Sequence, residues 1–294
     1  MPSADHENLV TALLTAPVPE QEPTLDQNRE GFDGLVGSSG TAPEVEFVEV
    51  ELAGVPTLRH EVEGSQAELL WVHGGGMVVG SATAYANPIS WLFPEYSTTI
   101  VDFRRAPEES MPAQLDDVVA AYRELVRGPN AAPIVIGGDS AGGGLALLAA
   151  ITLRDAGDPA PAAVVLVSPW SDYKLGDQIV AEISPPDPLL SREALAGMTA
   201  AFDGNGAGAD WSPTARDLGG LPPTHVECSA RDITSGDSQG LIALLEKAGV
   251  PVTSSMGEGL IHVYPILLPQ SPEGVEAADR MNTFIRTQTS KEER

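Results

Sequence analysis

Ser140 stands between an apolar run and a helical pattern in the segment IVIGGDSAGGGLALLAA. The residues Gly138–Gly142 have the form G-x-S-x-G, which in a strand–turn–helix context is the arrangement called a nucleophile elbow. Glycines are needed on both sides of the serine because larger side chains would collide with the strand and the helix. The pattern predicts that Ser140 Oγ is exposed above the carboxyl end of a sheet, where it can attack a carbonyl carbon.

A glycine-rich turn between a strand and a helix also occurs in nucleotide-binding folds. The dinucleotide fingerprint G-x-G-x-x-G requires a different spacing from that of Gly137–Asp139, and no lysine of the Walker type follows the turn. The sequence therefore favours a nucleophilic serine over a phosphate-binding loop.

A second glycine cluster, Gly74–Gly76, follows His73 in the segment LLWVHGGGMVVG, well before Ser140 in the chain. Attack of a serine on an ester creates an oxyanion, which is stabilised by backbone N–H groups that already point at it. Glycine leaves such N–H groups unobstructed, because it has no side chain. The cluster predicts oxyanion donors, and a flexible loop is the alternative.

Short apolar runs alternate with helical patterns from Leu69 onward. Both glycine clusters lie at the ends of such runs, so the elements that these runs form must position them. The runs are ELLWV, STTIVDF, APIVIG, AAVVLVS and THVEC. Continuous apolar runs suit strands that are buried on both faces. Strand and helix in alternation predict an α/β fold with a mostly parallel central sheet flanked by helices. Before them, VEFVEVEL and PTLRHEV predict a hairpin that turns at Ala53 and Gly54.

Taken together, these motifs resemble the hormone-sensitive-lipase-like family of α/β-hydrolase esterases. The matching segments are His73–Gly76 (HGGG), Gly138–Gly143 (GDSAGG) and Phe103–Glu108 (FRRAPE), the last departing at two positions from the usual YRLAPE. The segments DPLLSREAL and IHVY further resemble bacterial acetyl-hydrolases and ε-lactone hydrolases of that family. The resemblance implies an α/β-hydrolase fold with a helical cap over the active site. It also implies that the nucleophile, the acid and the histidine follow one another in that order.

This order selects the histidine that would serve as the base. Three of the five histidines precede Ser140, and His225 begins an apolar strand, at the wrong end for the carboxyl edge of the sheet. His262 follows the strand PVTSSM in an expected loop, which is the position required of the base. The family often has His-Gly-Phe here, whereas this chain has His-Val-Tyr. The excluded histidines that precede the serine are His6, His60 and His73.

Two acids, Asp232 and Asp237, compete for the role of orienting the base. Both follow the strand THVEC, in the segment ARDITSGDSQGL. Similar family members read Asp-Pro-Leu-Leu-Asp-Asp-Ser at this point, and the first aspartate is the one that orients the histidine. The resemblance therefore implies Asp232 as the acid and Asp237 as a cap of the following helix. An exchange of the two roles stays open, because ITSG replaces PLLD.

The resemblance implies a mechanism through an acyl-enzyme. Asp232 would fix the tautomer of His262, which would take the proton of Ser140 and return it to the leaving alkoxide. Water would then hydrolyse the acyl-enzyme with the same base. The expected oxyanion donors are the N–H groups of Gly74, Gly75 and Ala141.

Residues 1–40 and 173–213 interrupt the α/β pattern and are expected to form the cap, residues 1–40 as its N-terminal helical part. The α/β-hydrolase core is then expected over 41–172 and 214–294. Four side chains are candidates for the substrate pocket, with ordinary packing as an equal alternative: Met77, Val78, Trp170 and Tyr173.

Composition excludes several classes of function. The formal net charge of −26 and the absence of a basic cluster argue against binding of nucleic acid. No apolar run is long enough for a membrane span, and the N-terminus does not resemble a signal peptide, so a cytoplasmic location is expected. Cys228 is the only cysteine and no HExxH segment occurs, so neither a metal nor another cofactor is expected.

The acidic surface disfavours anionic substrates. A small neutral ester or lactone is therefore the expected substrate of this serine hydrolase, and a homodimer is compatible with the sequence. Acyl transfer to an alcohol would use the same residues and is an alternative. A second alternative is a ligand-binding receptor, since gibberellin receptors resemble this family but lack the histidine. The presence of His262 argues against the receptor.

Overall fold

The computed structural model describes residues 1–17, 21–42, 45–128, 132–175, 186–204 and 211–290. Eight strands form one sheet in the order β1-β2-β4-β3-β5-β6-β7-β8. β2 runs antiparallel to both of its neighbours, and every other neighbouring pair is parallel. The strands are β1 Val48–Leu52, β2 Val55–His60, β3 Glu68–Val72, β4 Ser97–Val101, β5 Ile134–Asp139, β6 Ala163–Val167, β7 Thr224–Arg231 and β8 Val252–Ile261.

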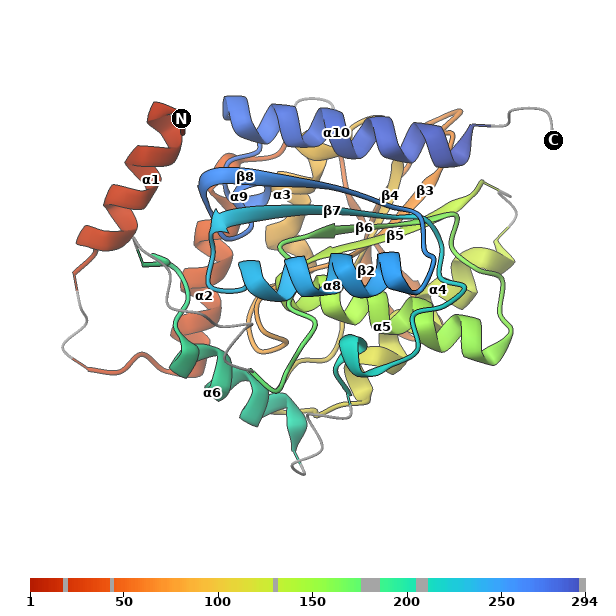
Figure 1. The fold of residues 1–294 in the computed structure, drawn as a ribbon, viewed down its shortest axis with the longest axis horizontal. Coiled ribbons are helices and arrows are strands. Elements are labelled where there is room, and N and C mark those ends of the chain that lie inside the picture. Colours follow the sequence, from red (N-terminus) through yellow and green to blue (C-terminus); the bar gives the residue numbers. More distant parts are fainter. Residues whose placement is uncertain (18–20, 43–44, 129–131, 176–185, 205–210, 291–294) are drawn as a thin grey trace.

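Helices cover both faces of this sheet. α4, α5 and α8 lie on one face, and α3 and α10 lie on the other (Figure 1). The helices are α1 Ala4–Thr15, α2 Leu25–Val36, α3 Ala82–Leu92, α4 Ala113–Arg127, α5 Ser140–Ala156, α6 Arg192–Asp203, α8 Ser235–Lys247, α9 Tyr264–Leu267 and α10 Pro272–Thr289. Short 3-10 turns occur at Gly37–Ser39 and Pro213–Ala215. The predicted α/β architecture is confirmed, including the hairpin of β1 and β2.

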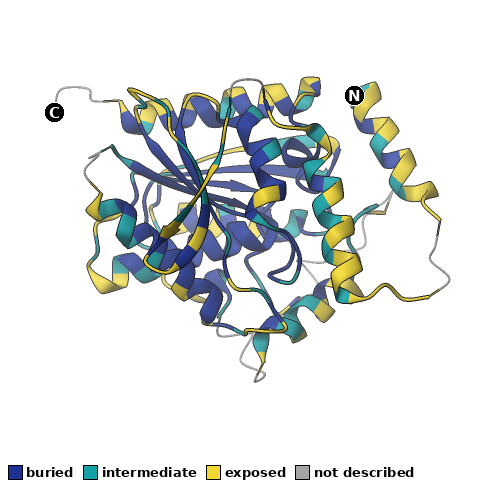
Figure 2. Ribbon diagram, turned by 180° about the vertical axis from the view of Figure 1, so that it is seen from behind, coloured by how far each residue is buried: buried dark blue, intermediate teal, exposed yellow. Residues whose placement is uncertain are grey.

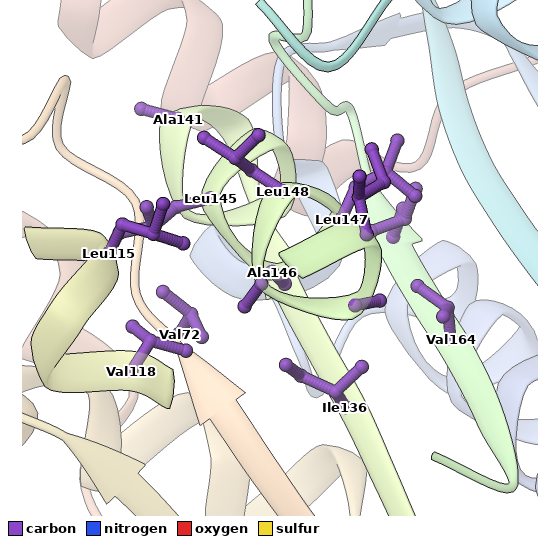
Figure 3. Packing of buried hydrophobic residues seen from close by; sticks show 14 of the residues in the cluster. Val72, Leu115, Val118, Ile136, Ala141, Leu145, Ala146, Leu147, Leu148 and Val164 are labelled. Atoms are coloured by element: carbon purple, nitrogen blue, oxygen red, sulfur yellow. The ribbon is translucent and has the colours of Figure 1, made fainter. Parts of the chain in front are cut away.

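The apolar runs form buried strands because each supplies side chains to both faces. In β3, Leu70 and Val72 pack into the core under α4 and α5, while Leu69 and Trp71 pack into the core on the opposite face. This alternation is the period of two that a strand imposes on its side chains. Figure 3 shows the first of these cores, where Val72 lies among side chains of α4 and α5.

α1 and α2 lie outside these layers and are lightly packed. His6 and Val10 are the buried residues of α1, and Val36 is the buried residue of α2. Figure 2 shows both helices with largely exposed outer surfaces. With α6, they lie at the end of the molecule toward which β7 points (Figure 1). No helix in the described ranges is both long enough and apolar enough to cross a membrane.

The junction of β5 and α5 is tightly folded. Ser140 begins α5 with a φ of 51°, a left-handed conformation that non-glycine residues seldom adopt. A Cβ on Gly142 would overlap the carbonyl oxygens of Val72 and His73, and one on Gly138 would overlap those of Gly142 and Val72. The two glycines of G-x-S-x-G therefore let the turn lie directly against the end of β3.

This close approach predicts opposite effects of two glycine-to-alanine changes within helices. Gly142→Ala should lower the free energy of unfolding by roughly 3 kcal/mol or more, because backbone atoms must move to admit the methyl group. Gly240→Ala, at an exposed position of α8 with open space around it, should raise it by about 0.5–1 kcal/mol. Urea unfolding measures both changes, and equal effects would contradict the packing described at the elbow.

Candidate active site

Three side chains from the carboxyl ends of β5, β7 and β8 form a continuous hydrogen-bonded row. Ser140 Oγ lies 2.9 Å from His262 Nε2, and His262 Nδ1 lies 2.8 Å from Asp232 Oδ2. Asp232 follows β7 directly, and His262 follows β8 without the expected loop. The other oxygen of Asp232 accepts hydrogen bonds from the N–H and the hydroxyl of Thr234, at 2.7 and 2.8 Å. This second pair of bonds fixes the carboxylate in the plane that His262 requires.

The electrostatics of this row favour proton uptake by His262. Burial lowers the pKa of the imidazole, but the nearby carboxylates, Asp232 foremost, together outweigh burial and raise the pKa of His262. Asp187 and Asp139 add smaller contributions in the same direction. Neutral His262 can take the proton of Ser140, and the imidazolium that forms would be stabilised by Asp232.

The turn after β3 is attached to the elbow by the side chain of Asp139. Gly74 N–H donates to Asp139 Oδ1 and to the hydroxyl of Tyr85, both at 3.1 Å. The Tyr85 hydroxyl donates to Asp139 Oδ2 at 2.7 Å, and Trp71 Nε1 donates to Oδ1 at 3.3 Å. Burial raises the pKa of Asp139 to about 6, although these donors oppose the shift. Gly74 is required here because a Cβ would overlap the carboxylate.

The prediction that Gly74 donates to an oxyanion is therefore wrong, since its N–H is already bonded to Asp139 and Tyr85. Gly75 and Gly76 line the cavity beside Ser140 and have left-handed φ angles of 101° and 64°. Within the part of the chain that the structure describes, no hydrogen bond engages the N–H of Gly75, Gly76 or Ala141. These three N–H groups are the available donors, and Gly76 takes the place that was predicted for Gly74.

A cavity of about 460 Å³ opens above Ser140 and His262. α2 and α6 form much of its wall, through side chains such as Phe32, Leu35 and Met198. Leu189 and Leu190, which precede α6, complete the apolar part. The remaining lining residues are Pro23, Gln27, Asn28, Gly31, Val36, Gly75, Gly76, Tyr85, Asp139, Leu195, Val263 and Leu267. Among the described residues, no group of three or more His, Cys, Asp or Glu side chains is arranged to hold a metal ion.

Comparison with known proteins identifies the family. Residues 69–266 match the model of a family described as having the alpha/beta hydrolase fold. The chain belongs to this family. An acetyl-hydrolase of Streptomyces hygroscopicus is 35% identical over 231 residues, which cover 76% of each chain. An esterase of Acinetobacter venetianus is 30% identical over 242 residues, which cover 80% of each chain.

A solved structure places the chain more narrowly within the α/β hydrolases. An esterase of the bacterial hormone-sensitive lipase family superposes with a TM-score of 0.88 at 30% identity, over 99% of this chain and 100% of the other. The predicted resemblance to hormone-sensitive-lipase-like esterases is thereby confirmed. Relatives and neighbours named as esterases and acetyl-hydrolases support ester hydrolysis as the reaction of this α/β hydrolase.

The prediction of pocket residues in this α/β hydrolase is wrong. None of the four candidates is among the residues that line the cavity above Ser140. Met77 is fully buried in the core, and Trp170 and Tyr173 pack edge-to-face with each other and with Phe202. Val78 is partly buried against the same core and accepts a hydrogen bond on its carbonyl oxygen. These side chains pack in the core outside the cavity, which is lined in large part by α2, α6 and the residues before α6.

Asp237 also differs from the prediction. It lies in the first turn of α8 but does not cap this helix, because Thr234 occupies the N-cap position. Its buried carboxylate instead accepts hydrogen bonds from the N–H and the hydroxyl of Ser171 and from the N–H of Asp172. Asp237 thus secures the loop after β6, and it has no hydrogen bond to His262.

Three residues of the site were missed by sequence reasoning. Asp139 occupies a variable position of G-x-S-x-G, and an acidic residue directly before the expected nucleophile was the signal that could have drawn attention to it. Tyr85 gave no signal, because its contact with Asp139 depends on how α3 packs. Gly76 belongs to the glycine cluster that the sequence showed. It could be preferred to Gly74 as a donor only once the structure showed that Gly74 N–H is already bonded.

The different partners of the two aspartates predict different defects. Asp232→Asn should lower kcat for a p-nitrophenyl ester by about 10⁴, because the amide no longer holds His262 in the required tautomer. Asp237→Asn should leave kcat within a few-fold and lower the free energy of unfolding by about 1–3 kcal/mol, since it disturbs buried bonds of the loop after β6. Steady-state kinetics and urea unfolding of both variants separate the effects. An inactive Asp237→Asn beside an active Asp232→Asn would reverse the two roles.

Proposed function

We propose that this chain is a serine carboxylesterase that hydrolyses small neutral esters, ε-lactones included, through an acyl-enzyme. The observation that carries the proposal is the row Ser140–His262–Asp232 at the floor of an apolar cavity. Beside the same serine, Gly75, Gly76 and Ala141 have N–H groups that make no hydrogen bond to any described residue. A nucleophile, a base and oxyanion donors thus meet at one point.

In the proposed reaction, His262 takes the proton of Ser140 Oγ as this oxygen attacks the ester carbon. The carbonyl oxygen becomes negative and is stabilised by N–H groups that are already in position, so that no reorganisation is needed as charge develops. His262 then gives the proton to the leaving alkoxide. Water repeats these steps on the acyl-enzyme and releases the acid.

The division into a core and a cap is part of the proposal. Residues 41–172 and 214–294 would form the core, and residues 1–40 and 173–213 the cap. Its support is that α2 and α6 line the cavity above Ser140. Residues 18–20, 176–185 and 205–210 of the proposed cap lie outside the described part of the chain.

The cavity supports a substrate with a short acyl chain. Its volume of about 460 Å³ is at the lower end of the range of ligand sites, and its walls are mostly apolar. Two carboxylates lie nearby, at Asp139 and Asp187, and the whole chain carries a formal charge of −26. Anionic esters should therefore bind poorly. A lactone suits one compact cavity, because its acyl and alcohol parts belong to the same ring.

The test is a series of p-nitrophenyl esters from acetyl to lauroyl, together with ε-caprolactone and a substituted ε-lactone. We expect kcat/KM to be highest between acetyl and hexanoyl, with turnover of the lactones. Ser140→Ala is the control and should lower kcat by a factor of about 10⁴–10⁶. Rising kcat/KM up to lauroyl with inert lactones would overturn the substrate class. Ester formation in the presence of an added alcohol, without hydrolysis, would assign the site to acyl transfer instead.

A further inference from the structure

Asp187 joins two segments that meet above the candidate active site. Its Oδ1 accepts hydrogen bonds from the N–H groups of Leu189 and Leu190, at 2.7 and 3.1 Å. Its Oδ2 accepts a hydrogen bond from the N–H of Ile233 at 2.9 Å. Ile233 is the residue directly after Asp232. One carboxylate therefore holds the segment before α6 and the turn after β7 together.

Both segments take part in the site. The two residues that Asp187 holds through Oδ1, Leu189 and Leu190, line the cavity beside Ser140. The turn that it holds through Oδ2 carries Asp232, the partner of His262. A shift of Asp187 would move the cavity wall and the proposed acid at the same time. Sequence reasoning used the segment DPLL only as part of a resemblance and gave its aspartate no role.

The charge of Asp187 also acts on His262. Three carboxylates, Asp232, Asp187 and Asp139, raise the pKa of the imidazole against the effect of burial. Burial raises the pKa of Asp187 itself, although the nearby His262 and the bonded N–H groups oppose this shift. A further bond links the same two segments: Arg231 Nε donates to the carbonyl oxygen of Pro186, the residue before Asp187, at 3.3 Å.

We propose that Asp187 is a positioning residue, which couples the acyl-binding wall at Leu189 and Leu190 to the Asp232–His262 pair. This inference rests on the proposed function, because it assigns Asp187 a part in ester hydrolysis at Ser140. Asp187 does not touch the reacting atoms. It acts through the cavity wall and through the base.

Two substitutions separate the bonds that Asp187 makes. In Asp187→Asn, the amide oxygen can keep the bonds to Leu189 and Leu190, but its NH2 group faces the N–H of Ile233, and the charge is lost. Asp187→Ala removes every bond. The matched control is Asp217→Asn, because exposed Asp217 makes the same kind of turn, with its Oδ1 accepting from Gly219 N–H at 2.9 Å, and has no bond to the site.

The measurement is kcat and KM for p-nitrophenyl acetate and hexanoate across a pH series, with Tm recorded for each variant. For Asp187→Asn we expect kcat to fall by roughly 10- to 100-fold with little change in KM, because the base is misplaced while the wall stays. The acidic limb of its kcat/KM profile should move to lower pH, since a charge that favours protonated His262 is gone. Asp187→Ala should in addition raise KM, more for hexanoate than for acetate.

The outcomes are distinct. If the wild-type protein and Asp217→Asn hydrolyse neither ester, the proposed function fails, and the positioning role of Asp187 in that reaction is overturned with it. If both are active and Asp187→Asn matches them in kcat, KM and pH profile, the positioning role is overturned. A lower Tm of Asp187→Asn with unchanged kinetics would likewise overturn it, because it would reduce Asp187 to a structural bond.

Discussion

Asp139 places an almost fully buried carboxylate between two backbone turns that come from neighbouring strands, β3 and β5. A buried charge is costly unless donors satisfy it, and here the donors are Gly74 N–H, Trp71 Nε1 and the Tyr85 hydroxyl. Because Gly74 N–H is bound in this way, the turn is fixed with the next two N–H groups beside Ser140, where no residue of the described ranges accepts a hydrogen bond from them. The oxyanion donors that we propose thus depend on the carboxylate of Asp139, which is not itself one of those donors.

α1 and α2 bury few side chains, and polar bonds attach both helices to the rest of the protein. Arg29 of α2 donates to Glu108 at 2.6 Å and to the carbonyl oxygens of Val78 and Ala106, both at 3.0 Å. His6 of α1 accepts a hydrogen bond from the N–H of Ile261, the residue before His262, at 3.1 Å. Burial lowers the pKa of His6, which favours the neutral form that can accept this bond.

α6 is attached by apolar contacts: Leu195 and Phe202 are buried in the core, and a further contact is made by Met198. This side chain lies directly over Gly76, so that a Cβ on the glycine would overlap its sulfur. Gly76 is thus in contact with the proposed cap on one side and borders the cavity on the other. The bonds of Asp187 add a second link between this segment and the turn that carries Asp232. The position of the cavity wall is therefore coupled to the position of Asp232.

Much of the fold could be predicted from the sequence, because apolar runs, helical patterns and glycines are local signals. The elbow at Ser140 and the place of His262 followed from motif and chain order. The role of Gly74 could not be predicted, since it depends on Asp139, which is distant in sequence and becomes a neighbour only through the pairing of β3 and β5. The same holds for Asp237, whose partner Ser171 follows β6.

The directions in which side chains point could not be predicted from the sequence either. Met77 lies next to the glycine cluster, yet its left-handed backbone, with a φ of 61°, accompanies a side chain that is buried in the core. Trp170 follows a strand at the correct edge, but its ring packs against Tyr173. Position along the chain places a residue near the site, and packing decides whether its side chain faces the cavity.

Reaction with diethyl p-nitrophenyl phosphate tests most directly whether Ser140 is the nucleophile. The reagent transfers its phosphoryl group to an activated serine and releases p-nitrophenolate, which is counted by absorbance. We predict one diethylphosphoryl group per chain, located by mass spectrometry on Ser140, and a proportional loss of ester hydrolysis. Modification of a different residue, or full hydrolytic activity after Ser140 is modified, would contradict the account.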